Sequence, residues 1–286
     1  MRFCSKGSSG GAGNLHRFGS RPDDGRANRG RRTTVTKTKW VFTPDEFAWV
    51  WGETGLDEYP DPISIIESAT TEDEYARIVG PIKARYPRFA DPDLTAPLRV
   101  LADPELRIVC TGRSHRSDKR ARSVGAVSGG LGVILFQKSG ASPEFGGDIQ
   151  LVVTSRENVP KQVAATMPPA QPGAAGDMVG YTPRVRGEES PSSWGRSRND
   201  ELPVEERIRA LLRAPRSAEG YLKVLTHLQT NRPQPPVYLS WIDVRDDHPA
   251  VGRYLIDINH HDTKLKAATV DATAAALARR AGLGRR

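Results

Sequence analysis

The stretch KWVFTPDEFAWVWGETGL, residues 39–56, places three tryptophans and two phenylalanines within twelve positions. Its first four residues favour a short β-strand. Thr43 then has the features of a helix N-cap, because a proline follows it and Glu46 completes a Thr-x-x-Glu capping box. Phe42 and Phe47 occupy the two positions of a hydrophobic staple. These independent signals predict a strand that leads directly into a helix.

The aromatic residues beyond the N-cap divide into two groups. Phe47, Val50 and Trp51 recur at i, i+3 and i+4, which predicts one buried stripe of a short helix that ends at a glycine of GETG. Trp49 lies off this stripe and is not assigned to the core. Most of the stretch is therefore expected to form the fold, with only Trp49 available to a surface.

The net charge of +8 belongs to one end of the chain. Residues 1–39 contain ten Lys or Arg and two Asp, whereas residues 40–286 contain 32 basic and 32 acidic side chains. The tail, residues 1–38, is poor in apolar residues and is expected to be disordered. It is either an over-long gene assignment, with Val35 as the start, or a genuine tail that contacts RNA or a membrane.

No secretory signal or membrane span is recognisable, so we expect a cytoplasmic protein without membrane insertion. The two cysteines, Cys4 in the tail and Cys110 in an expected strand, do not indicate a disulfide framework.

Periodicity and turn residues predict a regular order of elements beyond the first helix. Two long segments share the order helix, antiparallel strands, helix, which predicts an α+β fold with two related halves around one antiparallel sheet. Proline, glycine, serine and arginine dominate the segment between them, which is expected to be a flexible insert. The expected helices are 71–85, 91–102, 156–167, 203–213 and 271–280; the strands are 105–113, 122–128, 131–137, 148–154, 220–227, 237–244, 252–259 and 263–267; the single domain is 39–283, its halves are about 39–167 and 203–283, and the insert is 168–200.

The search for catalytic or metal-binding motifs is negative. The glycine-rich run SVGAVSGGLGVILF, residues 123–136, lacks the Gly-Lys-Ser/Thr of a phosphate loop, and β-branched residues follow its glycines. A tight hairpin therefore fits better than a nucleophile at Ser128, whose elbow needs a following helix. His248, His260 and His261 have poor spacing for a metal site. We expect no catalytic residue, metal or cofactor, which favours a binding protein over an enzyme.

The basic segment RSHRSDKRAR, residues 113–122, lies between two expected strands. It is either a solvated hairpin loop or a docking loop for an acidic or polar partner. Nucleic acid is not favoured here, because the body of the chain is neutral and the loop contains no aromatic residue. The candidate partner-binding residues are Arg113, Ser114, His115, Arg116, Lys119, Arg120 and Arg122.

Four segments together resemble the EspG family of ESX (type VII) secretion-associated chaperones of actinobacteria. They are WVFTPDEFAWVWGETGL (40–56), LTAPLRVLADPELRIVCTGR (94–113), GDIQLVVTSRENVPKQVAATMP (147–168) and WIDVRDDHPAVGRYLIDI (241–258). The start at Phe42 to Phe47 and the Gly252 to Tyr254 strand are the most telling pieces. The resemblance covers about 40–281 and does not explain the tail or the insert.

The resemblance implies a non-enzymatic cytoplasmic chaperone that binds PE/PPE heterodimers at the helical tip of the PPE protein and keeps them soluble for export. It also implies a central antiparallel sheet flanked by helical bundles, with quasi-twofold halves. Family contacts come from a loop between early strands, which corresponds to 113–122, from the sheet and from the C-terminal helices. The alternative function is a nucleic-acid-associated protein that uses the basic tail.

Overall fold

The first helix begins as the sequence predicts. β1 (Lys39–Phe42) leads into α1 (Pro44–Trp51) and a 3-10 turn, η1 (Gly52–Thr54). The Thr43 amide donates to the Glu46 carboxylate at 2.9 Å, and the Glu46 amide donates to the Thr43 hydroxyl at 3.2 Å, which confirms the capping box. The rings of Phe42 and Phe47 lie 6.1 Å apart, as the staple requires.

Trp49, which the sequence left unassigned, fastens α1 to the segment between the next two helices. Its indole N–H donates to the Tyr86 carbonyl at 2.8 Å, and the Arg88 guanidinium lies 4.2 Å from the ring centroid. A cation over an indole face is attracted by the ring quadrupole. The aromatic stretch therefore has internal partners for Trp49 as well as for its stripe.

The computed structural model describes residues 38–117, 119–190 and 202–284, all within one compact unit that begins at Thr36. Residues 1–37 lie outside this range, so both interpretations of the tail stay predictions. After η1 the elements are α2 (Glu72–Arg85), α3 (Pro92–Ala102), β2 (Leu106–Ser114), β3 (Arg120–Ser128), β4 (Leu131–Ser139), β5 (Gly146–Ser155), η2 (Arg156–Asn158), α4 (Val159–Ala165), β6 (Met178–Tyr181), α5 (Thr182–Arg186), α6 (Val204–Arg213), β7 (Arg216–Thr226), β8 (Val237–Val244), β9 (Gly252–Ile258), β10 (Asp262–Ala267) and α7 (Val270–Arg280).

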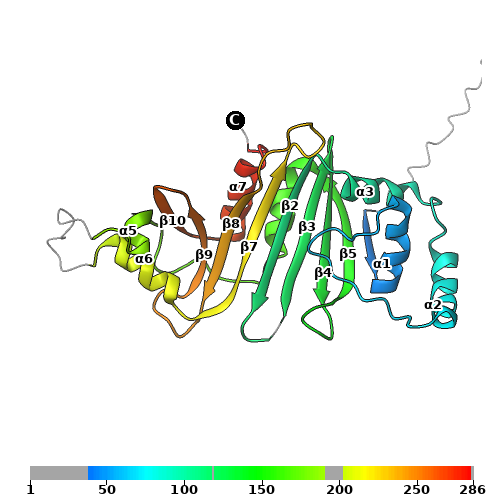
Figure 1. The fold of residues 1–286 in the computed structure, drawn as a ribbon, viewed down its shortest axis with the longest axis horizontal. Coiled ribbons are helices and arrows are strands. Elements are labelled where there is room, and N and C mark those ends of the chain that lie inside the picture. The colour runs from blue at the N-terminus through cyan, green and yellow to red at the C-terminus, as the bar shows by residue number, and fades with distance from the viewer. Residues whose placement is uncertain (1–37, 118, 191–201, 285–286) are drawn as a thin grey trace, which may run out of the picture. The chain divides into compact units, whose positions relative to one another are not determined.

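The ten strands form one sheet in the order β1-β5-β4-β3-β2-β7-β8-β9-β10-β6 (Figure 1). Every strand-to-strand pairing within it is antiparallel. β2 and β7 pair at the centre, with Cys110 opposite Leu222. The predicted α+β class with a central antiparallel sheet is confirmed.

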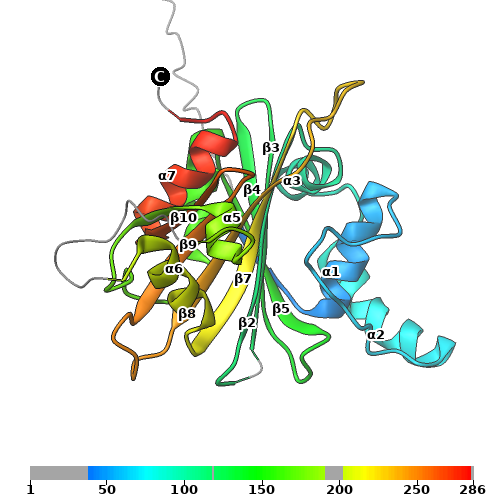
Figure 2. The same cartoon turned by 60° about the vertical axis from the view of Figure 1, so that its left-hand side comes forward.

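Helices cover the two faces of the sheet differently. Two successive residues of β2 show this, because successive side chains of a strand point to opposite faces of the sheet. Ile108 packs in a core cluster with residues of α4 and α7, whereas Val109 packs in one with residues of α1 and α3. Figure 2 shows α7 and α3 on opposite sides of the sheet. We call these sides the α4 face and the α1 face.

The insert expected at 168–200 contains regular structure over its described part. β6 pairs with β10, with Tyr181 opposite Asp262, and α5 follows directly. The expectation of a linker is thus wrong for 178–186, because a partner strand far along the chain stabilises this segment; residues 191–201 lie outside the described range. We propose that the second half begins at β6, so that β6, α5, α6, β7–β10 and α7 correspond in order to β1, α1, α3, β2–β5 and α4.

Residues 168–176, which we call the strap, cross the start of β9 and are held there by Arg253. Its guanidinium donates to both carboxylate oxygens of Asp243 at 2.7 Å and to the Pro168 carbonyl at 2.7 Å. The side chains of Arg253 and Asp243 are only 3% and 6% exposed. The guanidinium also lies 5.0 Å from the ring centroid of Trp241. This buried pair therefore connects the strap to two strands.

The neighbours of Arg253 hold the same strap. Gly252 has a φ of 114°, and a Cβ there would lie 2.6 Å from the Pro172 oxygen, so only glycine fits. The Tyr254 hydroxyl donates to the Ala250 carbonyl at 2.9 Å and accepts from the Ala175 amide at 2.8 Å. The Gly-Arg-Tyr sequence is thus explained by the fold itself.

Candidate functional site

A groove with a cavity volume of about 590 Å³ opens on the α4 face beside the β2–β3 hairpin. It exists because α4 is only seven residues long, whereas β4 and β5 have nine and ten. Glycines fix where α4 lies. A Cβ at Gly125 or Gly132 would come within 2.6 Å or 2.4 Å of Val159, so α4 packs tightly against one end of β3 and β4. The other end of these strands remains uncovered.

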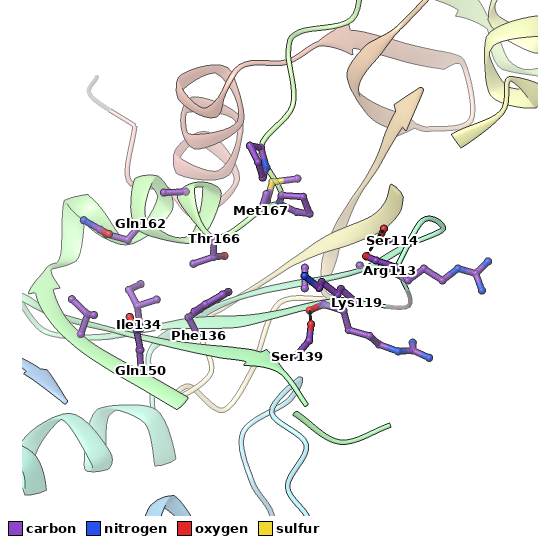
Figure 3. Close-up of a pocket in the computed structure, with 18 residues that line it drawn as sticks. Arg113, Ser114, Lys119, Ile134, Phe136, Ser139, Gln150, Gln162, Thr166 and Met167 are labelled. Carbon is purple, nitrogen blue, oxygen red and sulfur yellow. Dashed lines mark hydrogen bonds between the residues drawn. The ribbon is translucent and has the colours of Figure 1, made fainter. Parts of the chain in front are cut away.

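The floor of the groove is apolar and comes from the uncovered strand ends. Ile134 and Phe136 of β4 and Val152 of β5 lie on it, and Phe136 is only half-buried. Figure 3 shows Thr166 and Met167 on the opposite side of the cavity, at the end of α4. The full lining is Gly112, Arg113, Ser114, Ser117, Lys119, Arg120, Ala121, Ile134, Phe136, Ser139, Gln150, Val152, Gln162, Ala165, Thr166, Met167, Pro168 and Pro169.

β1, at the edge of the sheet, lies next to the groove. Val41 of β1 is paired with Gln150, a lining residue, so both side chains lie on the same face. Val41 is 44% exposed. Lys39 lies opposite Val152 in the same way, so the edge of the sheet beside the groove presents both an apolar and a basic side chain.

The β2–β3 hairpin, which contains the candidate loop 113–122, forms the rim of the groove. The Ser114 amide donates to the Lys119 carbonyl at 2.8 Å, which closes the hairpin end. In Figure 3 the Lys119 side chain points towards the cavity, whereas the Arg113 side chain points away from it. Alternation along the strands explains the difference, because Arg113 and Arg120 are a cross-strand pair on the α1 face.

Glu219 of β7 fixes the hairpin from the α1 face. Its carboxylate accepts from Arg113 at 2.9 Å, lies 3.2 Å from Nε2 of His115, and pairs with Arg216. Burial alone raises the pKa of Glu219, but the hydrogen bonds from Arg113 and Arg216 outweigh it and hold the pKa below its ordinary value. The His115 amide also donates to the Ser217 carbonyl at 2.8 Å. The hairpin is therefore pre-positioned by the second half of the sheet.

Arg122 does not belong to the exposed part of the predicted docking loop. The residue is 7% exposed, and its guanidinium donates to the Pro143 and Glu144 carbonyls at 2.6 and 2.8 Å. Burial lowers its pKa. Its charge is used to hold the β4–β5 connection, so we remove Arg122 from the candidate contact residues.

The other predicted residues occupy the rim in different ways. Arg116 pairs with Asp246 at 2.8 Å, but both side chains are well exposed, so the pair contributes little. Ser114, Lys119 and Arg120 all line the groove. The wall opposite the floor comes from α4; no residue of α7 lines the groove, although the C-terminal helices were expected to contribute.

The sequence did not identify the floor or the wall of the groove. Phe136 and Val152 were visible only as strand residues, and Met167 only as the end of a helix. A signal was nevertheless present, because Pro160 within the expected helix 156–167 favours a late helix start, and a helix shortened in this way cannot cover strands of nine or ten residues.

Neither a metal site nor a nucleophile elbow is present in the described part of the chain. There, no group of three or more His, Cys, Asp or Glu side chains could hold a metal ion. Ser128 pairs with Leu131 across Gly129 and Gly130, which confirms the tight hairpin. Among residues 38–117, 119–190 and 202–284, no helix has the length and apolar character needed to cross a membrane.

The antiparallel α+β fold thus presents an open groove with an apolar floor and a basic rim. The sequence profile of the EspG family matches residues 43–282, so the chain belongs to the EspG family. A search of curated protein sequences gave no significant match.

The fold is similar to a solved structure, that of the Mycobacterium tuberculosis type VII secretion system chaperone EspG5 in complex with a PE25–PPE41 dimer. The TM-score is 0.53 at 15% sequence identity, and the match covers 83% of this chain and 93% of that chain. The likeness confirms the fold that the sequence resemblance implied.

Proposed function

We propose that this protein is a cytoplasmic chaperone of type VII secretion. It binds PE/PPE-type heterodimers at the helical tip of the PPE subunit and keeps them soluble for export. The observation that carries the proposal is the open groove of an EspG-family sheet, whose apolar floor lies beside a basic hairpin. The EspG5 structure, solved with a PE25–PPE41 dimer, supports the choice of partner.

The geometry suits a chaperone that must later release its client. The floor residues Ile134, Phe136 and Val152 can shield apolar side chains of a helical tip from water. The polar rim provides selection among partners, and a groove of this size favours a moderate interface over a large obligate one. Such a task requires no activated nucleophile, so we propose a non-enzymatic protein.

Co-expression with PE–PPE pairs, followed by size exclusion, tests the proposal. Phe136→Glu places a charge on the floor and should weaken the complex by about 2 kcal/mol or more, roughly 30-fold in Kd, if Phe136 is a central contact. Tyr238→Glu is the matched control, because Tyr238 is 55% exposed and lies on the α1 face.

Three results bear on the proposal. Co-elution that is lost with Phe136→Glu and kept with Tyr238→Glu supports it. Failure of every PE–PPE pair to co-elute contradicts it. Deletion of residues 1–34 should leave binding intact, and loss of binding in that variant would favour the nucleic-acid alternative.

A further inference from the structure

The charged residues that line the groove, among those that the structure describes, are all basic. Among its eighteen lining residues, three are basic, namely Arg113, Lys119 and Arg120, and none is acidic. Arg113 is committed to Glu219 on the other face. The nearby carboxylate of Asp148 is paired with Lys138 at 3.2 Å.

Lys119 differs from the other two basic residues in its direction. Its side chain points towards the cavity in Figure 3, and it forms no ion pair with any residue that the structure describes. Arg120 lies across from Arg113 on the α1 face. Lys119 is therefore the cation that an occupant of the groove meets first.

A partner that closes over this groove removes water from the Lys119 ammonium. Burying an ammonium without a compensating acceptor is costly, whereas a carboxylate provides a strong, charge-assisted hydrogen bond. Because none of the lining residues that the structure describes supplies a carboxylate, we assign the acceptor to the occupant. A basic side chain at the same place would be repelled.

We propose that the segment which enters the groove carries a carboxylate beside its apolar side chain, and that Lys119 recognises this carboxylate. The proposal rests on the proposed function, because it specifies the chemistry of the tip that the groove accepts. The apolar side chain lies on Phe136 and Val152, and the neighbouring Asp or Glu pairs with Lys119 at the mouth. Lys119 is thus a specificity-determining residue.

The first measurement is the Kd of a PE–PPE complex with Lys119 variants. A hydrogen bond to a charged group predicts a Kd roughly 10-fold to 100-fold weaker for Lys119→Met, a larger loss for Lys119→Glu, and partial retention for Lys119→Arg. Lys138→Met is the control. Lys138 lies on β4 and is exposed, as Lys119 is, but it does not line the groove. The Kd of the complex with Lys138→Met should change less than about 2-fold.

The second measurement locates the carboxylate on the partner. Each Asp or Glu at the PPE tip is changed to its amide in turn. One of these changes should weaken wild-type binding but cause no further loss with Lys119→Met, as a double-mutant cycle requires of a direct pair. Lysine at that partner position should restore binding to Lys119→Glu. If Lys119 instead binds backbone carbonyl oxygens at the end of a partner helix, none of the amide changes will affect binding. That result overturns the proposal.

A synthetic helical hairpin with a Leu–Glu tip, compared with its Leu–Gln twin, separates this proposal from the proposed function. PE–PPE binding that is unchanged by Lys119→Met overturns the role of Lys119 and leaves the chaperone function standing. If no PE–PPE pair binds but the Leu–Glu hairpin binds and needs Lys119, the chaperone function fails and the carboxylate specificity stands. If neither probe binds, both proposals are wrong.

Discussion

Removing the charge of Asp243 should destabilise the protein far more than breaking an exposed ion pair. Asp243 and Arg253 are joined by two hydrogen bonds of 2.7 Å and are almost fully buried. Breaking such a pair leaves a buried charge without compensation and costs about 3–5 kcal/mol. We expect about 3 kcal/mol for Asp243→Asn, because the amide oxygen still accepts one of the two bonds.

This loss is large compared with the whole stability of a domain, which is about 5–15 kcal/mol. At about 2–4 °C per kcal/mol for a domain of this size, Tm should fall by roughly 6–12 °C. Asp148→Asn is the control, because Asp148 and Lys138 are 45% and 50% exposed and their pair contributes about 0–1 kcal/mol.

Urea unfolding followed by tryptophan fluorescence measures both variants, and Trp241 lies close enough to Arg253 to report on the site. The double variant Asp243→Leu with Arg253→Met should recover most of the loss, since apolar replacements of a buried pair are often neutral. A loss below 1 kcal/mol for Asp243→Asn, or an equal loss for Asp148→Asn, would refute the reasoning.

Three further predictions test the strap, the core and the hairpin. Gly252→Ala should cost about 1–3 kcal/mol in urea unfolding, since it combines a positive φ with a clash against the strap, whereas Gly80→Ala in α2, with open space around it, should be neutral or slightly stabilising. In a Cys4→Ser background, Cys110 should react with a thiol reagent at pH 8 only on unfolding, because burial raises its pKa to about 12 and leaves a thiolate fraction of about 10⁻⁴; rapid reaction of the folded protein would contradict this. The pKa of Glu219 is lowered in the folded state, so its stabilisation is complete at neutral pH and disappears as the pH falls through its lowered pKa. The difference in unfolding free energy between wild type and Glu219→Gln should therefore shrink on acidification, and a constant difference would remove Glu219 from the network.

The sequence predicts the elements that are specified locally. The N-cap at Thr43 depends on residues within one helical turn, and the hairpin at Gly129 depends on a two-residue turn, so both could be read without tertiary information. β6 could not, because its four residues are flanked by proline and glycine and depend on pairing with β10. Its strand character comes from a partner about 80 residues away.

In the candidate site, too, some features are specified by the local sequence and others depend on distant contacts. The basic hairpin is recognisable from its charges, but the burial of Arg122 depends on the carbonyls of Pro143 and Glu144, which approach only when the β4–β5 connection folds back. The groove floor depends on how far α4 reaches over the sheet. Two glycines decide that reach, and their contacts with Val159 are tertiary.

The way in which the β2–β3 hairpin is held has a consequence for protein engineering. Its ends are closed by the Ser114–Lys119 backbone bond, and its outer side is attached to Ser217 and Glu219 of the other half. A loop that is pinned at its base by the scaffold can change its tip without disturbing the sheet. Arg116 and Ser117, the exposed residues between these attachment points, are therefore the positions at which the tip can be exchanged while the sheet stays intact.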